Sequence, residues 1–385
     1  MATPSAPRIH LDYQNGAPLL PEVKAAIQEV LPWAANPSSL HAEGRAAARW
    51  RDQARVQVAA LVGARVEEVY FTSSGSEGNT WALTGLAEAY RSRGKHLIVS
   101  AVEHLSILQT VRRMEKEDWV VTVLPIDRNG RIDPERVEQA LTPKTTLVSL
   151  QWANSEVGTL QPMAEIARRV KGKGILLHAD AVAGAGQVPI DLRTVPVDAL
   201  SLAGNTFGGP PGVGALILRK GVRILPLFVG GTQEEGRRAG TENLLGIVGM
   251  GAASAVALRN LPALAEKVTP LRERLIRGIL KLLPEATLNG HPTERLPGHV
   301  SVSIPGVDAE ALVLALDRKG VSVGLGSACT SRTMKASHVL RAMGVEESRA
   351  RGTITCTLGM GTIAAEIDRL LELLPHAIER EIIKA

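Results

Sequence analysis

Three stretches of the sequence place glycine, serine, histidine or aspartate where an apolar segment begins or ends. In FTSSGSEGNT (71–80), the backbone N–H groups of Gly75 and Ser76 at a helix start could hold a phosphate, because the helix dipole favours negative charge there. In HADAV, the carboxylate of Asp180 could bind a protonated ring nitrogen, and in VEHLSI a helix begins at His104. Each stretch has an ordinary structural alternative: a capped helix start, a turn aspartate and a satisfied histidine.

The two cysteines have contrasting surroundings. Cys329 stands in GLGSACTSR, among small and polar residues and near Arg332, whose positive charge would lower the pKa of the thiol. Cys356 alternates with apolar residues in TITCTL, as an inert buried thiol would. We therefore predict that Cys329 is the reactive thiol, the alternative being a thiol without a role. Because the two form no CxxC motif, both are expected to stay reduced in a reducing compartment.

Short apolar runs separated mostly by helix-length segments predict a parallel sheet. The predicted strands are EVYFT (68–72), HLIVSA (96–101), WVVTVLP (119–125), TTLVSLQ (145–151), GILLHAD (174–180) and VDALSLA (197–203). After them, SLAGNTFGGPPGVGAL (201–216) predicts a glycine-rich turn and a hairpin. This alternation indicates βαβ units with helices on both faces of the sheet. Ligands of such sheets bind at the carboxyl ends of the strands, where Asp180 lies.

Longer segments predict helices and a second unit. A helix is expected from residue 38 to Gly63, and a long helical region from about 240 to 283. From about residue 285, a smaller α+β unit is predicted by HVSVSI, AEALVLALDRKG, VSVG, SHVLRAMG, TITCT and the last helix IAAEIDRLLELLPHAIEREI. We expect an N-terminal segment (1–20) that contributes to the small domain, a large domain (21–260) and a small C-terminal domain (261–385).

The composition is typical of a folded soluble protein. Hydrophobic residues make up 45% of the 385 residues and charged residues 22%. The net charge of +5 includes no long basic run, and aromatic residues are only 3%, so nucleic-acid binding is not expected. The start, MATPSAPRIHLDYQ, has no apolar core of a signal peptide, and no stretch of about 18 uninterrupted apolar residues occurs. We therefore expect a cytoplasmic protein without membrane association.

Together and in this order, the motifs resemble the cysteine desulfurase family, within the class V aminotransferase group of pyridoxal-phosphate (PLP) enzymes. The resemblance covers nearly the whole chain. It rests on LDYQNGAPLLPEV, NPSSLHAEGRAA, FTSSGSEGN, VEHLSIL, ANSEVGTLQP, HADAV, GRRAGTENLLGIVG, LPGHVSVSIPGVDAEALVLALDRKGVSVGLGSACTSR and SHVLRAMG.

The resemblance implies a fold and positions for the cofactor ring. The fold is the α/β fold type I of PLP-dependent transferases, with a large, mostly parallel sheet domain and a smaller α+β domain, in a homodimer. By the same resemblance, His104 stacks on the PLP ring, Asp180 binds the pyridine nitrogen and Asn154 approaches the phenolic oxygen.

The resemblance also implies a phosphate site and a nucleophile. Gly75, Ser76 and the partner subunit's Thr241 would hold the phosphate. Cys329 would be the catalytic residue that takes sulfur as a persulfide and passes it to an acceptor or to an iron–sulfur scaffold protein. No metal site is predicted, apart from Cys329 as a candidate ligand of an iron–sulfur cluster.

The chain departs from the family pattern at several of these positions. The family's Ser-x-His-Lys segment reads AGNT here, so the lysine that forms a Schiff base with PLP is replaced by Thr206. The serine and the histidine of that segment are Ala203 and Asn205. A glutamine expected after DAV is Ala183, and the arginine that would clamp the substrate carboxylate is Thr355.

These departures lead us to interpret the chain as a pseudoenzyme of sulfur mobilisation, with ordinary PLP turnover lost and PLP held non-covalently if it binds. Cys329 would then carry a persulfide or ligate an iron–sulfur cluster. One alternative is an active desulfurase that converts cysteine to alanine and an enzyme persulfide, with Lys335 as a substitute amine. Another is a non-catalytic regulatory partner in a dimer.

Overall fold

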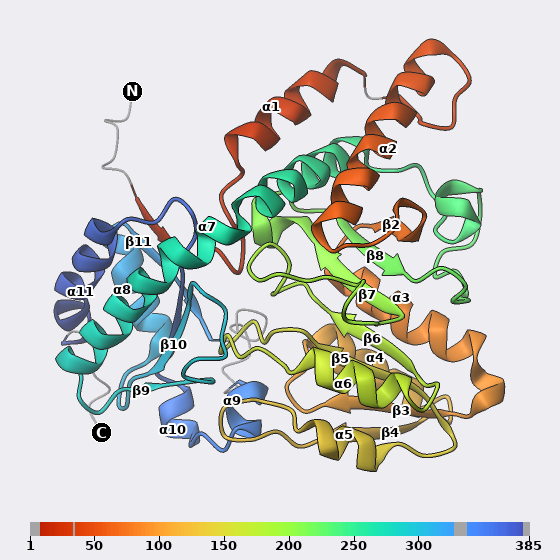
Figure 1. The fold of residues 1–385 in the computed structure, drawn as a ribbon. Coiled ribbons are helices and arrows are strands. Elements are labelled where there is room, and N and C mark those ends of the chain that lie inside the picture. The colour runs from red at the N-terminus through yellow and green to blue at the C-terminus, as the bar shows by residue number, and fades with distance from the viewer. Residues whose placement is uncertain (1–7, 34, 327–336, 380–385) are drawn as a thin grey trace.

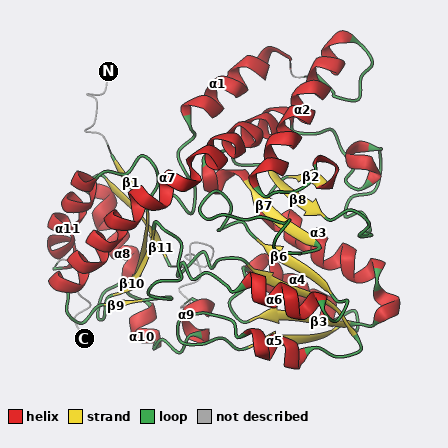
Figure 2. Cartoon of the chain, viewed as in Figure 1, coloured by secondary structure: helices red, strands yellow, loops and turns green. Residues whose placement is uncertain are grey.

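Two β-sheets and the helices that cover them make up the chain (Figure 1). The computed structural model describes residues 8–33, 35–326 and 337–379. Figure 2 shows the helices around the larger sheet and the smaller sheet apart from it. The α/β architecture predicted from the sequence is confirmed.

The larger sheet contains all the predicted strands. Its strands are β2 (Val69–Thr72), β3 (His96–Ser100), β4 (Val120–Leu124), β5 (Thr145–Gln151), β6 (Leu176–Asp180), β7 (Ala199–Ala203) and β8 (Gly214–Leu218). They lie in the order β2-β8-β7-β6-β5-β3-β4. Only β8 runs antiparallel to its neighbours, because the hairpin after β7 turns the chain back. The carboxyl ends of the other strands therefore meet at one edge.

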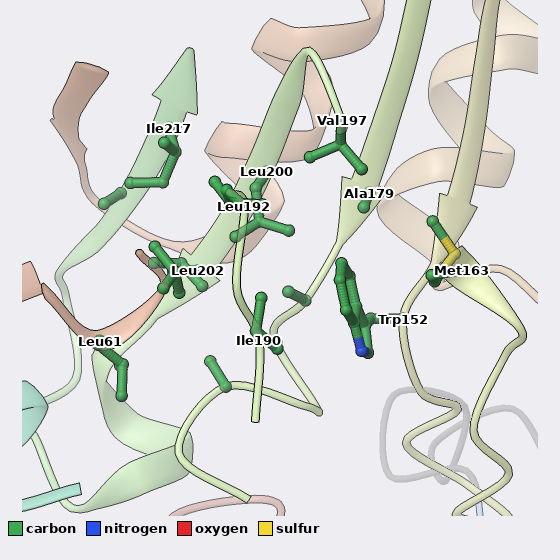
Figure 3. Close-up of a cluster of buried hydrophobic side chains, with 14 of the residues drawn as sticks. Leu61, Trp152, Met163, Ala179, Ile190, Leu192, Val197, Leu200, Leu202 and Ile217 are labelled. Atoms are coloured by element: carbon green, nitrogen blue, oxygen red, sulfur yellow. The ribbon is translucent and has the colours of Figure 1, made fainter. Parts of the chain in front are cut away.

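Helices cover both faces of this sheet because most of its strands carry apolar side chains at consecutive positions, which point to opposite faces. They are α1 (Pro21–Val30), α2 (Ala42–Leu61), α3 (Gly75–Ala89), α4 (Leu105–Glu115), α5 (Pro134–Ala140) and α6 (Met163–Lys171). Phe71, Ile98 and Val148 belong to the core with α1, α2, α5 and α6 (part of it is shown in Figure 3). Their neighbours Tyr70 and Leu97 face α3 and α4. This period of two is the geometry of a strand buried on both faces.

The smaller sheet joins the two ends of the chain. Its strands are β1 (Ile9–Leu11), β9 (Thr287–Leu288), β10 (His299–Ser303), β11 (Val321–Leu325) and β12 (Thr353–Thr357), in the order β1-β11-β12-β10-β9. The remaining helices here are α8 (Ala309–Arg318), α9 (His338–Ala342), α10 (Glu347–Ala350) and α11 (Ala364–Ile378). β1 pairs in parallel with β11, so the N-terminal strand completes a sheet built otherwise from C-terminal residues.

Helix α7 (Leu244–Leu282) is continuous over 39 residues and packs on α1, α2 and α11 (Figure 1). The helix runs through residue 260 without a break. The domain limits at residues 20 and 260 stay a prediction. Within the described residues it is the one helix long and apolar enough to span a membrane. However, 56% of its most apolar window is buried inside the protein, as in a core helix.

The predicted start of α2 was wrong by a few residues, for a local reason. The helix begins at Ala42 rather than at residue 38, because the His41 side chain accepts a hydrogen bond from the Gly44 N–H and caps it. The predicted end was right: the helix ends at Leu61, and Gly63 follows with a φ of 65°, a left-handed conformation that suits glycine.

Candidate active site

A pocket of about 270 Å³ lies where the carboxyl ends of β5, β6 and β7 meet the smaller sheet. We call it the carboxyl-end pocket. It brings together most of the residues that the sequence suggested: Gly75, Ser76, His104, Asn154, Asp180, Ala183, Ala203, Asn205, Thr206 and Thr355. Thr241 is exposed and does not line the pocket of its own chain. Cys329 and Lys335 lie outside the described residues.

The start of α3 forms one wall of the pocket. The Ser74 hydroxyl accepts a hydrogen bond from the Glu77 N–H, so this is a capped helix start as well as a candidate phosphate site. The next residues, Gly75 and Ser76, present first-turn N–H groups, which have no acceptor within a helix. A side chain at Gly75 would meet Val182 Cγ2 at 2.4 Å, so glycine lets α3 pack closely on the segment after β6.

Asp180 ends β6 and is held by a chain of hydrogen bonds. Asn79 Nδ2 donates to Asp180 Oδ2 at 2.7 Å and to the Ser106 hydroxyl oxygen at 3.0 Å. The Val182 N–H donates to Asp180 Oδ1 at 3.0 Å. Ser106 in turn contacts His104, since its N–H donates to His104 Nδ1 at 3.1 Å. Asp180 and His104 are therefore positioned through the same two residues.

Sequence reasoning missed Asn79 and Ser106. Asn79 stands four residues after Gly75, on the same face of α3, and Ser106 follows His104 by two residues. Both stand inside stretches that were singled out for other residues. Helical spacing was a signal that could have identified Asn79.

Asn154 lines the pocket, but its amide is used to shape a loop. Its Oδ1 accepts hydrogen bonds from the N–H groups of Glu156 and Val157, both at 2.9 Å. Its Nδ2 donates to Val102 O at 3.1 Å and to Gln151 Oε1 at 3.3 Å. The role toward a ring oxygen stays a prediction, and the observed contacts are those of a structural asparagine.

Glu103 is a second buried carboxylate that sequence reasoning missed. It is fully buried, and Ser100 Oγ donates to its Oε1 at 2.5 Å. Burial raises the pKa of Glu103 to about 8, against the effect of the Ser100 hydrogen bond, and the negative charge of Asp180 raises it further. Glu103 is therefore mostly neutral at pH 7, beside an aspartate that lines the same pocket.

Glu156 and His338 meet across the pocket from distant parts of the chain. Ser337 donates a short hydrogen bond to Glu156 Oε2, and His338 Nδ1 lies 4.0 Å from Glu156 Oε1. His338 Nε2 contacts Glu103 O at 2.9 Å, and because a carbonyl only accepts, Nε2 carries the proton. Burial raises the pKa of Glu156 to about 7 and lowers that of His338. No local signal in ANSEVGT or SHVLRAMG indicated this contact.

Four of the five positions predicted to depart from the family pattern, Ala183, Ala203, Asn205 and Thr206, lie on the side of the larger sheet, and Thr355 lies on the side of the smaller sheet. The Thr206 side chain is buried, and its hydroxyl lies 2.9 Å from Val182 O and 3.1 Å from Ala203 O, both hydrogen-bond acceptors. Thr206 stands in the short 3₁₀ turn η4 (Gly204–Phe207) that follows β7. Ala183 and Ala203 add only methyl groups there.

On the side of the smaller sheet, the pocket is lined by neutral polar groups. Thr355 is buried on β12, and its hydroxyl has a long 3.5 Å contact with Leu325 O. Asn15, which follows β1, donates to Asp12 Oδ1 at 2.8 Å. Burial raises the pKa of Asp12, against the opposing effect of that hydrogen bond.

The titratable groups that line the pocket, among the described residues, are carboxyl groups and imidazoles. Among these lining residues, none is a lysine or an arginine. The acids are Glu103, Glu156 and Asp180, and the imidazoles are His104 and His338. Within the described part of the pocket, the donors that suit an anion are the backbone N–H groups at the start of α3.

The described residues fit the phosphate and the ring of PLP. The first turn of α3 offers N–H groups for a phosphate, and Asp180 offers a carboxylate for a protonated ring nitrogen. Gln151 Nε2 and Asn79 Oδ1 are buried at this pocket and have no hydrogen-bond partner among the described residues. Such buried polar atoms indicate a site made for a polar ligand or water.

Cys356, the cysteine that the structure describes, is buried in the smaller sheet. It stands on β12 and is 1% exposed. Burial raises the pKa of its thiol to about 12, and the charge of Asp12 adds to this. The predicted inert surroundings of Cys356 are confirmed.

Known proteins resemble this chain over nearly its full length. The class V aminotransferase family matches residues 9–370. A cysteine desulfurase IscS of Methanosarcina thermophila is 41% identical over 372 residues, which cover 96% of this chain and 92% of that protein. A cysteine desulfurase IscS of Clostridium botulinum is 41% identical over 379 residues, which cover 97% of this chain and 95% of that protein.

Solved structures agree with these relatives. A NifS-like protein has a TM-score of 0.91 at 32% identity, covering 97% of this chain and 100% of its own. A NifS-like protein from Rickettsia africae has a TM-score of 0.87 at 31% identity, covering 97% of this chain and 99% of its own.

Proposed function

Because the chain belongs to the cysteine desulfurase family of class V aminotransferases, we propose that it acts in sulfur mobilisation with non-covalently held PLP and with Cys329 as its sulfur carrier. The observation that carries the proposal is Thr206. Its hydroxyl is buried beside the carbonyl oxygens of Val182 and Ala203, at the position where the family pattern has lysine. A hydroxyl cannot form an imine with the aldehyde of PLP. Ordinary desulfurase turnover would therefore be lost or strongly reduced.

The pocket residues would hold PLP through charge and hydrogen bonds. The N–H groups of Gly75 and Ser76 would receive the phosphate, and the carboxylate of Asp180 would accept a hydrogen bond from the ring nitrogen. Bound PLP supplies an electron sink for an amine substrate. Asn79 would keep Asp180 oriented, since it donates to Asp180 Oδ2 at 2.7 Å.

Cys329, which lies outside the described residues, would receive the sulfur. Leu325 and Gly326 line the pocket just before the undescribed segment, and His338 and Val339 line it just after. The thiolate of Cys329 would attack the outer sulfur of a donor persulfide, so that a new S–S bond forms and the donor leaves as a thiolate. This exchange is balanced without an oxidant. The same thiolate of Cys329 could instead bind an iron–sulfur cluster as a ligand.

Partners and location are part of the proposal. We expect a homodimer, in which the partner subunit's Thr241 completes the phosphate site. A sulfur acceptor or scaffold protein would take sulfur from Cys329. We propose that this takes place in the cytoplasm.

Borohydride trapping tests the absence of a covalent bond. The protein is incubated with PLP and reduced, and its intact mass is measured; we expect no pyridoxyl adduct. The Thr206→Lys variant is the positive control and should gain one adduct. An adduct on the unmodified chain would contradict the proposal, and its location at Lys335 would identify the substitute amine.

Alkylation under native conditions tests the role of Cys329. With the pKa of Cys356 raised to about 12, its thiolate fraction at pH 8 is small. We expect Cys329 to react with iodoacetamide about 1,000-fold faster or more. Cys329→Ser should abolish the fast reaction and the uptake of persulfide sulfur. Equal labelling of the two cysteines would contradict the carrier role, because that role requires Cys329 to be more reactive than Cys356.

A second candidate function is ordinary cysteine desulfurase turnover. It is favoured by the relatives named cysteine desulfurase that are 41% identical over 96% of this chain. Alanine release from cysteine decides between the two functions. Release at an ordinary enzyme rate, about 1 s⁻¹ or more, would establish this second function and overturn the first.

A further inference from the structure

A second cavity, of about 410 Å³, lies at the opposite end of β7 from the carboxyl-end pocket. We call it the amino-end cavity. Ala199, the first residue of β7, lines it, whereas Ala203, the last residue, lines the carboxyl-end pocket. No described residue lines both. The two ends are about 13 Å apart, at 3.3 Å per residue of strand.

The floor of the amino-end cavity is apolar and belongs to the core of the large sheet. Leu192, Val197, Leu200 and Ile217 line it, and all four are buried (Figure 3). Of these four side chains, Leu192 is the most exposed, at 8%, and the other three are at most 2% exposed.

The rim of the cavity is cationic. Arg65, Arg193, Arg219 and Lys220 line it, together with the carboxylates of Glu68 and Asp198. A cavity of this size with an apolar floor and a few converging charged groups is typical of small-molecule sites.

Both carboxylates are already occupied by other groups. The carboxylate of Glu68 accepts hydrogen bonds from the backbone N–H groups of Arg65 and Lys220, each at 2.9 Å. Asp198 accepts from Lys171 Nζ at 2.7 Å and from the Leu177 N–H at 2.8 Å. Neither carboxylate therefore pairs with the guanidinium groups of the rim.

Two of the four cations form no ion pair with an acid among the described residues. Arg219 donates its Nε to Val197 O at 3.1 Å and its Nη2 to Leu192 O at 2.9 Å, and both acceptors are neutral carbonyls. Arg65 acts on Glu67 only at longer range: the pKa of Glu67 is lowered mainly by a backbone hydrogen bond, then by Lys220, and least by the charge of Arg65. Arg219 is thus held in a defined orientation while its charge remains available.

The other two cations form ion pairs at the surface. Arg193 pairs with Asp191 through two hydrogen bonds of 2.8 Å each, and 76% of its side chain is exposed. Lys220 Nζ lies 3.6 Å from Glu67 Oε1, and both side chains are exposed. A single exposed pair such as that of Lys220 contributes little and rearranges at small cost.

We propose that the amino-end cavity binds a phosphate-bearing ligand of nucleotide size. The phosphate would be received by the guanidinium groups of Arg65 and Arg219, whose forked donors match phosphate oxygens. The rest of the ligand would fill the cavity and contact Leu192. A phosphate with two negative charges can balance the charge of two guanidinium groups, whereas a single carboxylate can balance only one. The site is independent of PLP and of Cys329, and so does not rest on the function proposed above.

Calorimetric titration of the full chain with ADP tests this site. We expect saturable binding in the wild type, and binding weakened about tenfold or more in Arg65→Gln, since each charged hydrogen bond lost is a factor of this order. Arg219→Gln should show a larger loss, and Arg219→Lys, which keeps the charge, a smaller one. Arg113→Gln is the matched control, because Arg113 is 58% exposed on α4 and lines neither site.

Two further titrations separate the possible ligands and sites. Inorganic phosphate should bind at least tenfold more weakly than ADP, because it fills only a small part of the cavity of about 410 Å³ and makes fewer contacts in it. ADP should bind equally well to protein saturated with PLP. Any of four results would overturn the proposal. The first two are no ADP binding at millimolar concentration, and ADP binding in Arg65→Gln and Arg219→Gln that is as tight as in the wild type. The other two are phosphate binding as tight as ADP binding, and displacement of ADP by PLP. Arg65 makes no side-chain bond to the core among the described residues, so its variant tests the site even if an Arg219 variant fails to fold.

Discussion

The carboxyl-end pocket and the amino-end cavity lie at the two ends of the same strand, yet they would receive an anion in opposite ways. In the carboxyl-end pocket the described charged residues are acids and histidines, and the anion site is the backbone of the first turn of α3. In the amino-end cavity four cations line the rim and both carboxylates are occupied. The polarity of the chain explains the difference. Helices begin at the carboxyl edge of a parallel sheet and end at its amino edge, so only side chains can supply positive charge at the amino edge.

The largest expected effect comes from placing cations in the carboxyl-end pocket. Thr206→Lys returns an amine, but the substrate carboxylate would still face Thr355. We expect the double variant Thr206→Lys, Thr355→Arg to exceed the single one by more than tenfold in kcat/KM for alanine release from cysteine. The reason is that each charged hydrogen bond contributes about 1.5–3 kcal/mol. A single variant as active as a normal family member would show that Thr355 is not at the carboxylate site.

The second prediction separates the two sites by their carboxylates. Asp180→Asn keeps the shape of the side chain but removes its charge, so PLP should bind about 10- to 100-fold more weakly. ADP binding at the amino-end cavity should not change, because Asp180 does not line that cavity. Both affinities are measured by calorimetry on the same preparations. A parallel loss of ADP binding would mean that the two ligands share one site.

The third and smallest effect is a difference in pH dependence. Because the pKa of Glu156 is raised to about 7, this carboxyl is neutral below pH 7 and negatively charged above it. Added negative charge repels a bound phosphate by about 1 kcal/mol, about fivefold in affinity. PLP binding should therefore weaken between pH 6 and pH 8 more in the wild type than in Glu156→Gln. Glu156→Gln is also the control for the ionisation of PLP itself, which changes PLP binding in both proteins.

The amino-end cavity serves as the reference for that experiment. Glu156 does not line this cavity. Substituting Glu156 should leave the pH profile of ADP binding unchanged. If Glu156→Gln changed both profiles equally, the effect would come from the stability of the fold and not from the charge of the pocket.

The strands and most of the pocket residues could be predicted from the sequence because their signals are local. β-Branched apolar runs predicted the strands from β2 to β7, and the order of these runs predicted a parallel sheet. Residues at strand ends, such as Asp180 and Thr206, then had to lie at a common edge. The capping of α2 by His41 was missed, because the chain before it could equally have continued a helix.

Other features were decided by the tertiary structure alone. Glu156 meets His338 although they stand 182 positions apart in the sequence, and burial in the folded pocket raises the pKa of Glu156. Arg65 and Arg219 come together because β8 returns beside β2, and each stands among other charged residues in the sequence. The sequence by itself determined which segments are buried and that most of the strands run parallel, since apolar periodicity is written in neighbouring residues; the order of the strands in the sheet was decided by the tertiary structure. Which charges become neutral, and which remain uncompensated, depends on desolvation and on contacts between distant segments, and these exist only after the chain has packed.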